Sequence, residues 1–73
     1  MLTFEVIQQN NNQEVKVYCD ESGFNLLVKA LHEAQKQGHV HLLSPSSGGN
    51  ELESITIFGT KAVDEVIITV TPD

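Results

Sequence analysis

Two histidines stand close together in the stretch 39–52, HVHLLSPSSGGNEL, directly before a loop that contains one proline and two glycines. Side chains two positions apart on a β-strand point to the same side, so His39 and His41 could bind one metal ion together. No third ligand for this metal ion is predicted, because His32 falls on a predicted helix and Cys19 lies on the opposite side of the predicted sheet. We therefore expect histidines that pack or form hydrogen bonds on a half-exposed sheet, with no metal and no other cofactor.

Cys19 is the single cysteine of the chain, and together with a histidine it would be the smallest pair capable of thiol chemistry. A reactive thiol needs an accessible, electropositive setting, but Cys19 precedes Asp20 and Glu21. It also ends the alternating series Val15, Val17, Cys19, which we predict to point inward. We therefore expect Cys19 to be a buried and inert hydrophobic side chain, and we identify no catalytic nucleophile.

The loop 44–50, SPSSGGN, is rich in glycine but lacks the Gly-Lys-Ser/Thr ending of a phosphate-binding loop. Its glycines permit positive φ angles and a close approach of the backbone, which suits either a tight turn or a partner that docks on the main chain. Glu51 and Glu53 do not form an evident acid/base pair. We predict no catalytic residues, and the protein is not expected to be an enzyme.

The composition is that of a small acidic domain. The chain has 73 residues, and four Lys or Arg against ten Asp or Glu give a formal net charge of −6. This charge opposes binding to nucleic acid and favours a basic partner. One cysteine, no signal peptide and no apolar run of membrane-spanning length predict a single domain, 1–73, that works in the cytoplasm without contact with a membrane.

The first half of the chain predicts a hairpin followed by a helix. Residues 2–8 and 14–19 alternate between apolar and polar, and the run QNNNQ between them suits a turn. Ser22 or Asp20 can begin the helix, and Gly38 can end it. Its apolar positions are Phe24, Leu27, Val28, Leu31 and Ala34, and the strand residues predicted to face it are Leu2, Phe4, Val6, Val15, Val17 and Cys19.

Three more strands are predicted in the second half of the chain, at 39–43, 54–58 and 65–71, with alternating apolar residues such as Ile55 and Ile57 in the middle one. Gly59 and the segment 60–64 would connect the last two strands. The predicted fold is therefore a single small α+β domain of order ββαβββ, with a mainly antiparallel sheet and one helix packed on one face.

One helix can cover one face of such a sheet, so the other face would expose a set of apolar side chains. An exposed apolar patch of this kind usually marks an interaction surface. A slip of strand register, or a loop that covers the patch, is the alternative explanation. The side chains predicted on this open face are Ile7, Tyr18, Leu43, Phe58 and Ile67.

The stretch 39–52, together with the turn 19–23 and the helix that follows it, resembles the immunity protein 32 family of bacterial polymorphic toxin systems. The resemblance covers most of the chain and centres on a His-Leu-hydrophobic-Ser/Thr-Pro core followed by two glycines. The residues that carry it are His41, Pro45, Gly48, Gly49 and Leu52.

The resemblance implies a cytoplasmic antidote that binds and neutralises a cognate protein toxin, without catalysis. The open sheet face and the loop after it would form the binding surface. Two alternatives remain: an interaction module that forms homodimers through the open face, and a small metal-binding protein that uses His39 and His41. The predicted partner-binding residues are Tyr18, His39, His41, Leu43, Ser44, Pro45, Gly48, Gly49, Asn50 and Phe58.

Overall fold

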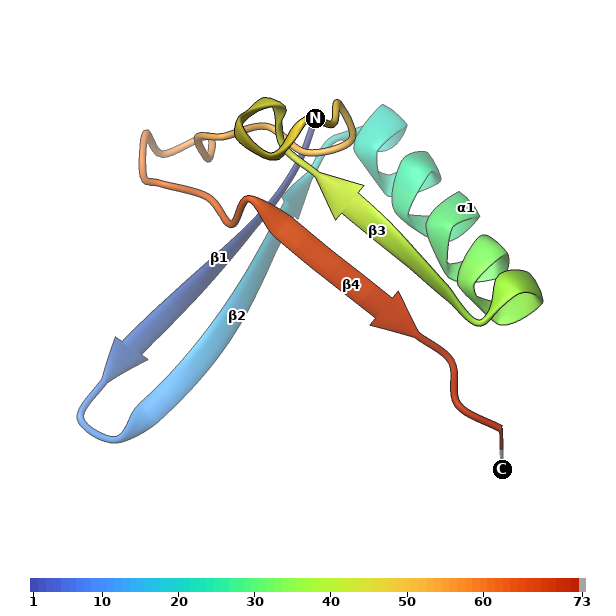
Figure 1. The fold of residues 1–73 in the computed structure, drawn as a ribbon. Helices are drawn as coiled ribbons and strands as arrows, with labels where there is room; N and C mark the ends of the chain where they lie inside the picture. Colours follow the sequence, from blue (N-terminus) through green and yellow to red (C-terminus); the bar gives the residue numbers. More distant parts are fainter. Residues whose placement is uncertain (73) are drawn as a thin grey trace.

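Two antiparallel hairpins and one helix make up the fold, in the order ββαββ (Figure 1). The structure is a computed structural model that describes residues 1–72. It confirms the predicted α+β class and the helix packed against strands. The elements are β1 (Leu2–Gln9), β2 (Asn12–Cys19), α1 (Glu21–Gln37), β3 (His39–Leu43), a 3₁₀ turn (Pro45–Ser47) and β4 (Glu65–Thr69).

The first hairpin closes through a two-residue turn of asparagines. Asn10 and Asn11 have φ angles of 48° and 66°, and asparagine adopts such positive values more readily than most residues. The turn pairs Gln9 with Asn12 and sets a regular register along both strands, with Leu2 opposite Cys19. The predicted hairpin is confirmed, and its strands extend further toward the turn than the alternation alone indicated.

Side-chain and backbone caps define both ends of α1. The Asp20 carboxylate accepts the N–H of Gly23 at 2.8 Å and the hydroxyl of Ser22 at 3.0 Å, and it contacts the N-terminal ammonium group of Met1 at 2.5 Å. At the other end Gly38, with a φ of 98°, donates its N–H to the carbonyl oxygen of Ala34. The predicted caps Asp20 and Gly38 are therefore confirmed.

The core is small and lies where the helix meets both hairpins. Its buried members come from β1, α1, β3 and the loop after β3, so four separate segments meet there. Partly buried side chains from β1, α1, β3 and β4 surround this centre. The buried centre consists of Leu2, Ala30, Leu42 and Leu52, and around it pack Phe4, Leu26, Leu27, Val40, Val66 and Ile68.

The two hairpins are separate two-stranded sheets that meet at one end only. There Glu53 donates its N–H to the carbonyl oxygen of Leu2 at 3.2 Å, and Val63 donates to that of Phe4 at 2.8 Å. Beyond this point β1 and β4 diverge, and α1 runs along β3 (Figure 1). The far half of the first hairpin is consequently left without cover.

Several predicted core residues are therefore exposed. Val6 and Val15 lie opposite each other in the register, and they are 60% and 66% exposed because the hairpin extends past the helix. Cys19 is also exposed, so the prediction of a buried thiol is wrong. The other predicted inward residues that the structure leaves exposed are Val17 on β2 and Phe24, Val28 and Leu31 on α1.

The predicted strand 54–58 is not formed. Only Ile55 makes a bridge, to Lys61, and the residues between them form a tight turn. Thr56 donates its N–H to the carbonyl oxygen of Thr60, and Gly59, at a φ of 80°, donates its N–H to that of Thr56, both at 2.9 Å. This local turn satisfies backbone groups that a strand would have used. It leaves Ile55 and Ile57 exposed rather than inward, and Phe58, predicted on the open face, is exposed as well.

The position of Asp20 predicts an acid-dependent loss of stability. The N-terminal ammonium group, followed by Gly23 and Ser22, lowers the pKa of Asp20 to about 2. A lowered pKa stabilises the folded state above the unfolded value near 4, and this stabilisation is lost as the pH falls from about 4 to about 2. Asp20→Asn keeps a capping oxygen but removes the charge, so it lacks this stabilisation. The difference in free energy of unfolding between wild type and Asp20→Asn should therefore shrink as the pH falls through this window. A gap between the two proteins that stays constant down to pH 2 would contradict the assignment.

The exposure of Cys19 predicts rapid labelling. We expect a thiol-specific chromogenic reagent to modify the native protein without denaturant, and Cys19→Ser to abolish the signal. Because the side chain is exposed, the same substitution should change the free energy of unfolding by less than about 1 kcal/mol. Labelling that requires denaturant would show that the thiol is shielded in solution.

Candidate functional site

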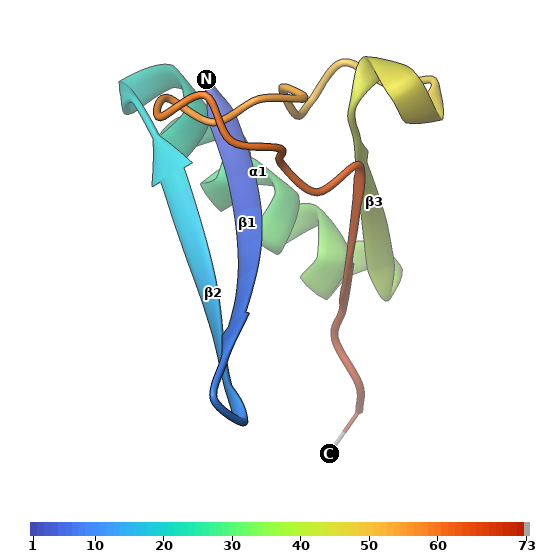
Figure 2. The same ribbon diagram turned by 90° about the vertical axis from the view of Figure 1, so that its left-hand side faces the viewer.

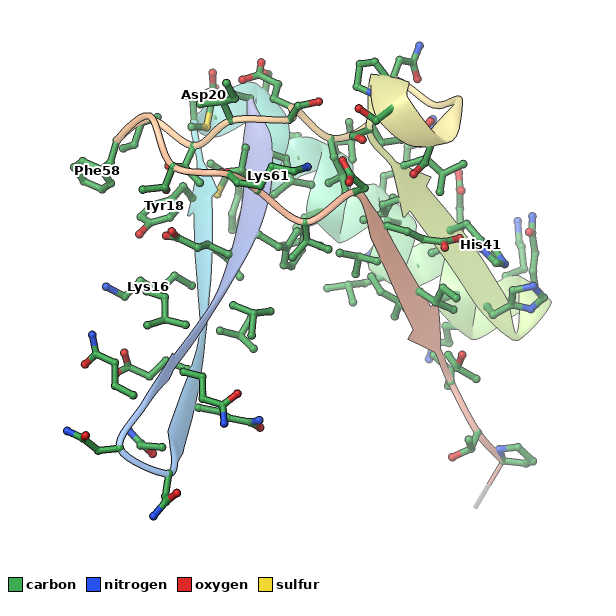
Figure 3. The ribbon with its side chains drawn as sticks, turned by 60° about the vertical axis from the view of Figure 1, so that its left-hand side comes forward. Lys16, Tyr18, Asp20, His41, Phe58 and Lys61 are labelled. Atoms are coloured by element: carbon green, nitrogen blue, oxygen red, sulfur yellow. The ribbon has the colours of Figure 1, made fainter. Side chains whose placement is uncertain are left out.

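A half-buried tyrosine and an exposed phenylalanine form an aromatic pair beside the first hairpin. The rings of Tyr18 on β2 and Phe58 on the turn 55–61 meet edge to face, with centroids 5.4 Å apart and planes at 76° (Figure 3). The Tyr18 hydroxyl donates to Glu5 Oε1 at 3.2 Å. Phe58 itself is 70% exposed, which is an unusual position for a large apolar ring.

Tyr18 remains a neutral hydrogen-bond donor over the physiological pH range. Its partial burial raises the pKa of its hydroxyl, and the hydrogen bond and negative charge of Glu5 raise it further. An edge-to-face contact of this kind holds both rings in one orientation. The pair is therefore a fixed surface feature in which an apolar ring lies beside a polar hydroxyl.

The turn that presents Phe58 is braced from inside. Thr56 is buried, and its Oγ1 accepts the N–H of Phe58 at 3.2 Å and contacts Thr60 Oγ1 at 2.6 Å. Figure 2 shows the chain passing from the end of β3 across to β2 and back toward β4. The turn thus reaches the predicted open face at Tyr18, whereas Ile67 of the same predicted face remains 54% exposed.

A depression beside β2 extends the aromatic pair. Ile57 lines it together with Met1 and the end of β2, and the residues from that end are Val17, Tyr18, Cys19 and the following Asp20. We refer to Val17, Tyr18, Ile57 and Phe58 as the aromatic patch. Val17 and Ile57 were not predicted as site residues, because the alternation of apolar residues placed both on the inward face. The signal that could have located Ile57 was Gly59 between Thr56 and Thr60, a pattern typical of a turn.

The two strand histidines form a second, separate cluster. The rings of His39 and His41 lie 5.2 Å apart, and His41 Nδ1 is 3.1 Å from Glu65 Oε2 on the paired strand β4. Both histidines are exposed. Within residues 1–72, no three His, Cys, Asp or Glu side chains come together in a way that could hold a metal ion.

The loop after β3 is anchored by Ser44. This residue is buried, its N–H donates to the carbonyl oxygen of Asp64 at 2.9 Å, and its hydroxyl donates to Asp64 Oδ1 at 2.8 Å. The hydrogen bond from Lys61, followed by that from Ser44, lowers the pKa of Asp64. Ser44 therefore ties the loop to the start of β4, and Pro45 begins the 3₁₀ turn at an exposed position.

The glycine pair folds this loop back onto Leu43. Gly48 has a φ of 88°, and a Cβ atom on Gly49 would lie 2.4 Å from the Cβ of Leu43. Glu51 and Leu52 both donate their N–H groups to the carbonyl oxygen of Leu43, and Glu51 Oε1 accepts the N–H of Leu43. Both glycines therefore have structural roles, and Leu43 is half-buried beneath the loop.

The predicted partner-binding residues do not form one surface. Figure 3 shows Tyr18 and Phe58 on one side of the molecule and His41 on the other. Of the loop residues, Ser44 and Leu43 are turned to internal packing, whereas Pro45, Gly48 and Asn50 are exposed. The predicted set thus separates into the aromatic patch and a second region formed by β3 and its loop.

The helix α1 is neither long nor apolar enough to cross a membrane, and it is the one α-helix in residues 1–72. In comparisons with known protein families, curated proteins and solved structures, no match to this chain was found. The geometry of the patch and the loop therefore carries the functional argument.

The loop geometry predicts unequal costs for substitutions of its glycines. Gly49→Ala should lower the free energy of unfolding by about 2 kcal/mol, because the added carbon overlaps Leu43. Gly48→Ala should cost about 1 kcal/mol through its positive φ alone, and Gly48→Asn less. Chemical denaturation measures these values, with the exposed Ser46→Ala as a control expected to change stability by less than about 0.5 kcal/mol. A neutral Gly49→Ala would mean that the loop does not rest on Leu43.

Proposed function

We propose that this protein binds a partner protein through the aromatic patch and that the partner is a bacterial toxin, which it neutralises in the cytoplasm. The observation that carries the proposal is Phe58, an aromatic ring 70% exposed and held against Tyr18 by a hydrogen-bonded turn. The identity of the partner as a toxin is supported by the resemblance of the stretch 39–52 to the immunity protein 32 family.

The patch has the properties of an interface centre. Aromatic side chains contribute a disproportionate share of binding energy in protein complexes. Thr56 braces the turn and Tyr18 holds the ring of Phe58, so little conformational entropy remains to be lost on binding. The hydroxyl of Tyr18 and the carboxylate of Glu5 supply polar contacts at the border of the apolar area.

The acidity of the chain supports a basic partner. The net charge is −6, and Glu5 and Asp20 both lie next to the aromatic patch. Such charges mainly raise the rate of association with an oppositely charged protein. A toxin that acts on nucleic acid would carry basic side chains for phosphate groups, and acidic residues beside the patch would compete for them.

A second contact region is compatible with this proposal. His41 and Glu65 are exposed as a pair on β3 and β4, and Pro45 and Asn50 are exposed on the loop. A toxin that touched both regions would have to bridge the two hairpins. The family signature residues Gly48 and Gly49 would then support binding indirectly, by shaping the loop.

The proposal is tested by co-expressing the protein with the product of the neighbouring gene, which the proposal expects to be a toxin. Phe58→Ala should abolish or strongly reduce protection, with a loss of about 2 kcal/mol in binding free energy, or roughly 30-fold in Kd. Tyr18→Phe is the matched variant, because it keeps the ring contact and removes the hydrogen bond to Glu5; a smaller loss is expected. Calorimetric titration of the purified proteins measures the affinities, and high salt should slow association more than it speeds dissociation.

Two further variants locate the surface. Lys36→Ala in the last turn of α1 should protect as wild type does, and His41→Ala reports on the second region. Because Phe58 is exposed, thermal melts should show that Phe58→Ala remains folded. Full protection by a folded Phe58→Ala protein would refute the aromatic patch as the binding site, and absence of any binding to the neighbouring toxin would refute the immunity function.

A further inference from the structure

The outer edge of β2 carries unpaired backbone groups. The hydrogen bond from the Asp20 N–H to the carbonyl oxygen of Met1 continues the ladder between β1 and β2. Together with the register, it identifies which cross-strand pairs of the hairpin are hydrogen-bonded. Bonded pairs recur at every second residue in an antiparallel ladder. The N–H and C=O groups of Gln13, Val15 and Val17 therefore point away from β1, and none of them has a backbone partner within residues 1–72.

This edge carries the charged residues Glu14 and Lys16 but lacks the other features that usually protect an edge strand. The pairing register of β2 is regular over eight residues and its sequence contains no proline. Among residues 1–72, no loop forms backbone hydrogen bonds along this edge. Val15 and Val17 add exposed apolar side chains on one face of the strand. A long, regular edge of this kind is a template for pairing with another strand.

The charges on β2 are complementary to themselves. Glu14 and Lys16 flank Val15 and share the face that carries Tyr18. A two-fold axis through Val15 would place each Glu14 opposite the Lys16 of a second copy, as an isologous interface requires. These two positions would form the closer, non-hydrogen-bonded pairs of the new ladder, where opposite charges attract most strongly.

We propose that β2 pairs in antiparallel fashion with β2 of a second copy of this chain, about a two-fold axis at Val15. Each Val15 N–H donates to the Val15 carbonyl oxygen of the other copy. The groups of Gln13 and Val17 bond reciprocally on either side. The two hairpins then form one four-stranded sheet, and the exposed row of Val6 and Val15 continues across the axis.

The neighbouring registers of the proposed dimer would form less favourable charge pairs between the two strands. Shifting the axis to Lys16 would place the two copies of Lys16 opposite each other. Shifting it to Val17 would place Glu14 opposite Asp20. Both shifts keep outward-pointing residues in bonded pairs, so the backbone alone does not choose among the three registers, and the charges select Val15.

The proposed dimer does not rest on the proposed function. Phe58 projects from the turn 55–61 rather than from the strand edge, so the Tyr18–Phe58 ring pair stays outside the new backbone ladder, whereas Val17 belongs both to the aromatic patch and to the edge. The edge contact is small, and small interfaces are weak. We therefore expect a dimer that forms and dissociates reversibly with concentration.

The first test is sedimentation of the full chain from about 1 μM to about 1 mM, the range in which a weak interface associates. Wild type should shift from monomer to dimer. Val15→Pro removes the outward N–H but no bond within the hairpin, so it should remain monomeric and folded. Val15→Ala keeps the N–H and should still dimerise. In hydrogen exchange, the amides of Gln13, Val15 and Val17 should gain protection with concentration.

The second test uses charge reversal to check the register. Glu14→Lys and Lys16→Glu should each weaken self-association by about 10- to 100-fold, because each creates two like-charged pairs. An equimolar mixture of the two variant chains should associate again, since unlike charges then face each other across the axis.

Three results would overturn the proposal. A wild-type chain that stays monomeric up to about 1 mM excludes a dimer of even weak affinity. Dimerisation of Val15→Pro at wild-type strength, or loss of the dimer in Phe58→Ala, would place the interface on another surface. A mixture of the two charge variants that associates no better than either variant alone would exclude the register centred on Val15.

Discussion

The two hairpins are joined at one end, where Val63 donates its N–H to the carbonyl oxygen of Phe4 and Glu53 donates to that of Leu2. The small core around Leu2 and Leu42 lies at this joint, because only there do both hairpins and the helix come together. A chain of 73 residues has too little apolar material to cover both hairpins over their whole length. The exposed Val15 and the unpaired edge of β2 are direct consequences of that geometry.

The segment between β3 and β4 has two parts with different roles. In the first part, Ser44 binds Asp64 and the glycine pair lets the chain return onto Leu43, so its distinctive residues are used for folding. In the second part, the turn braced by Thr56 uses its own backbone bonds and presents Phe58 outward. A motif that is prominent in the sequence can therefore shape a scaffold while less conspicuous residues form an exposed surface.

The aromatic patch and the edge of β2 differ in the physics of recognition. The patch offers a rigid apolar ring beside a hydroxyl, which suits burial against a hydrophobic pocket of another protein. The edge of β2 offers backbone donors and acceptors with a charge pattern that matches its own copy. The two surfaces share Val17, but the ladder uses the strand edge and the Tyr18–Phe58 ring pair lies outside it, so a dimer would present two ring pairs and a bivalent partner would gain avidity from engaging both.

Local signals in the sequence determined the elements that depend on neighbouring residues. The asparagine turn at 10–11, the cap at Asp20 and the stop at Gly38 were predicted because each is decided within a few residues. The residues 54–58 have the same alternation as a strand, but strand formation needs a distant partner, and a local turn competed successfully. Only the tertiary structure decided that Cys19 and Val15 are exposed and that Phe58 meets Tyr18, because burial depends on how far the helix reaches over the hairpin and on where a loop crosses it. Alternation states which side chains share a face, whereas the angle between the two hairpins decides whether anything covers that face.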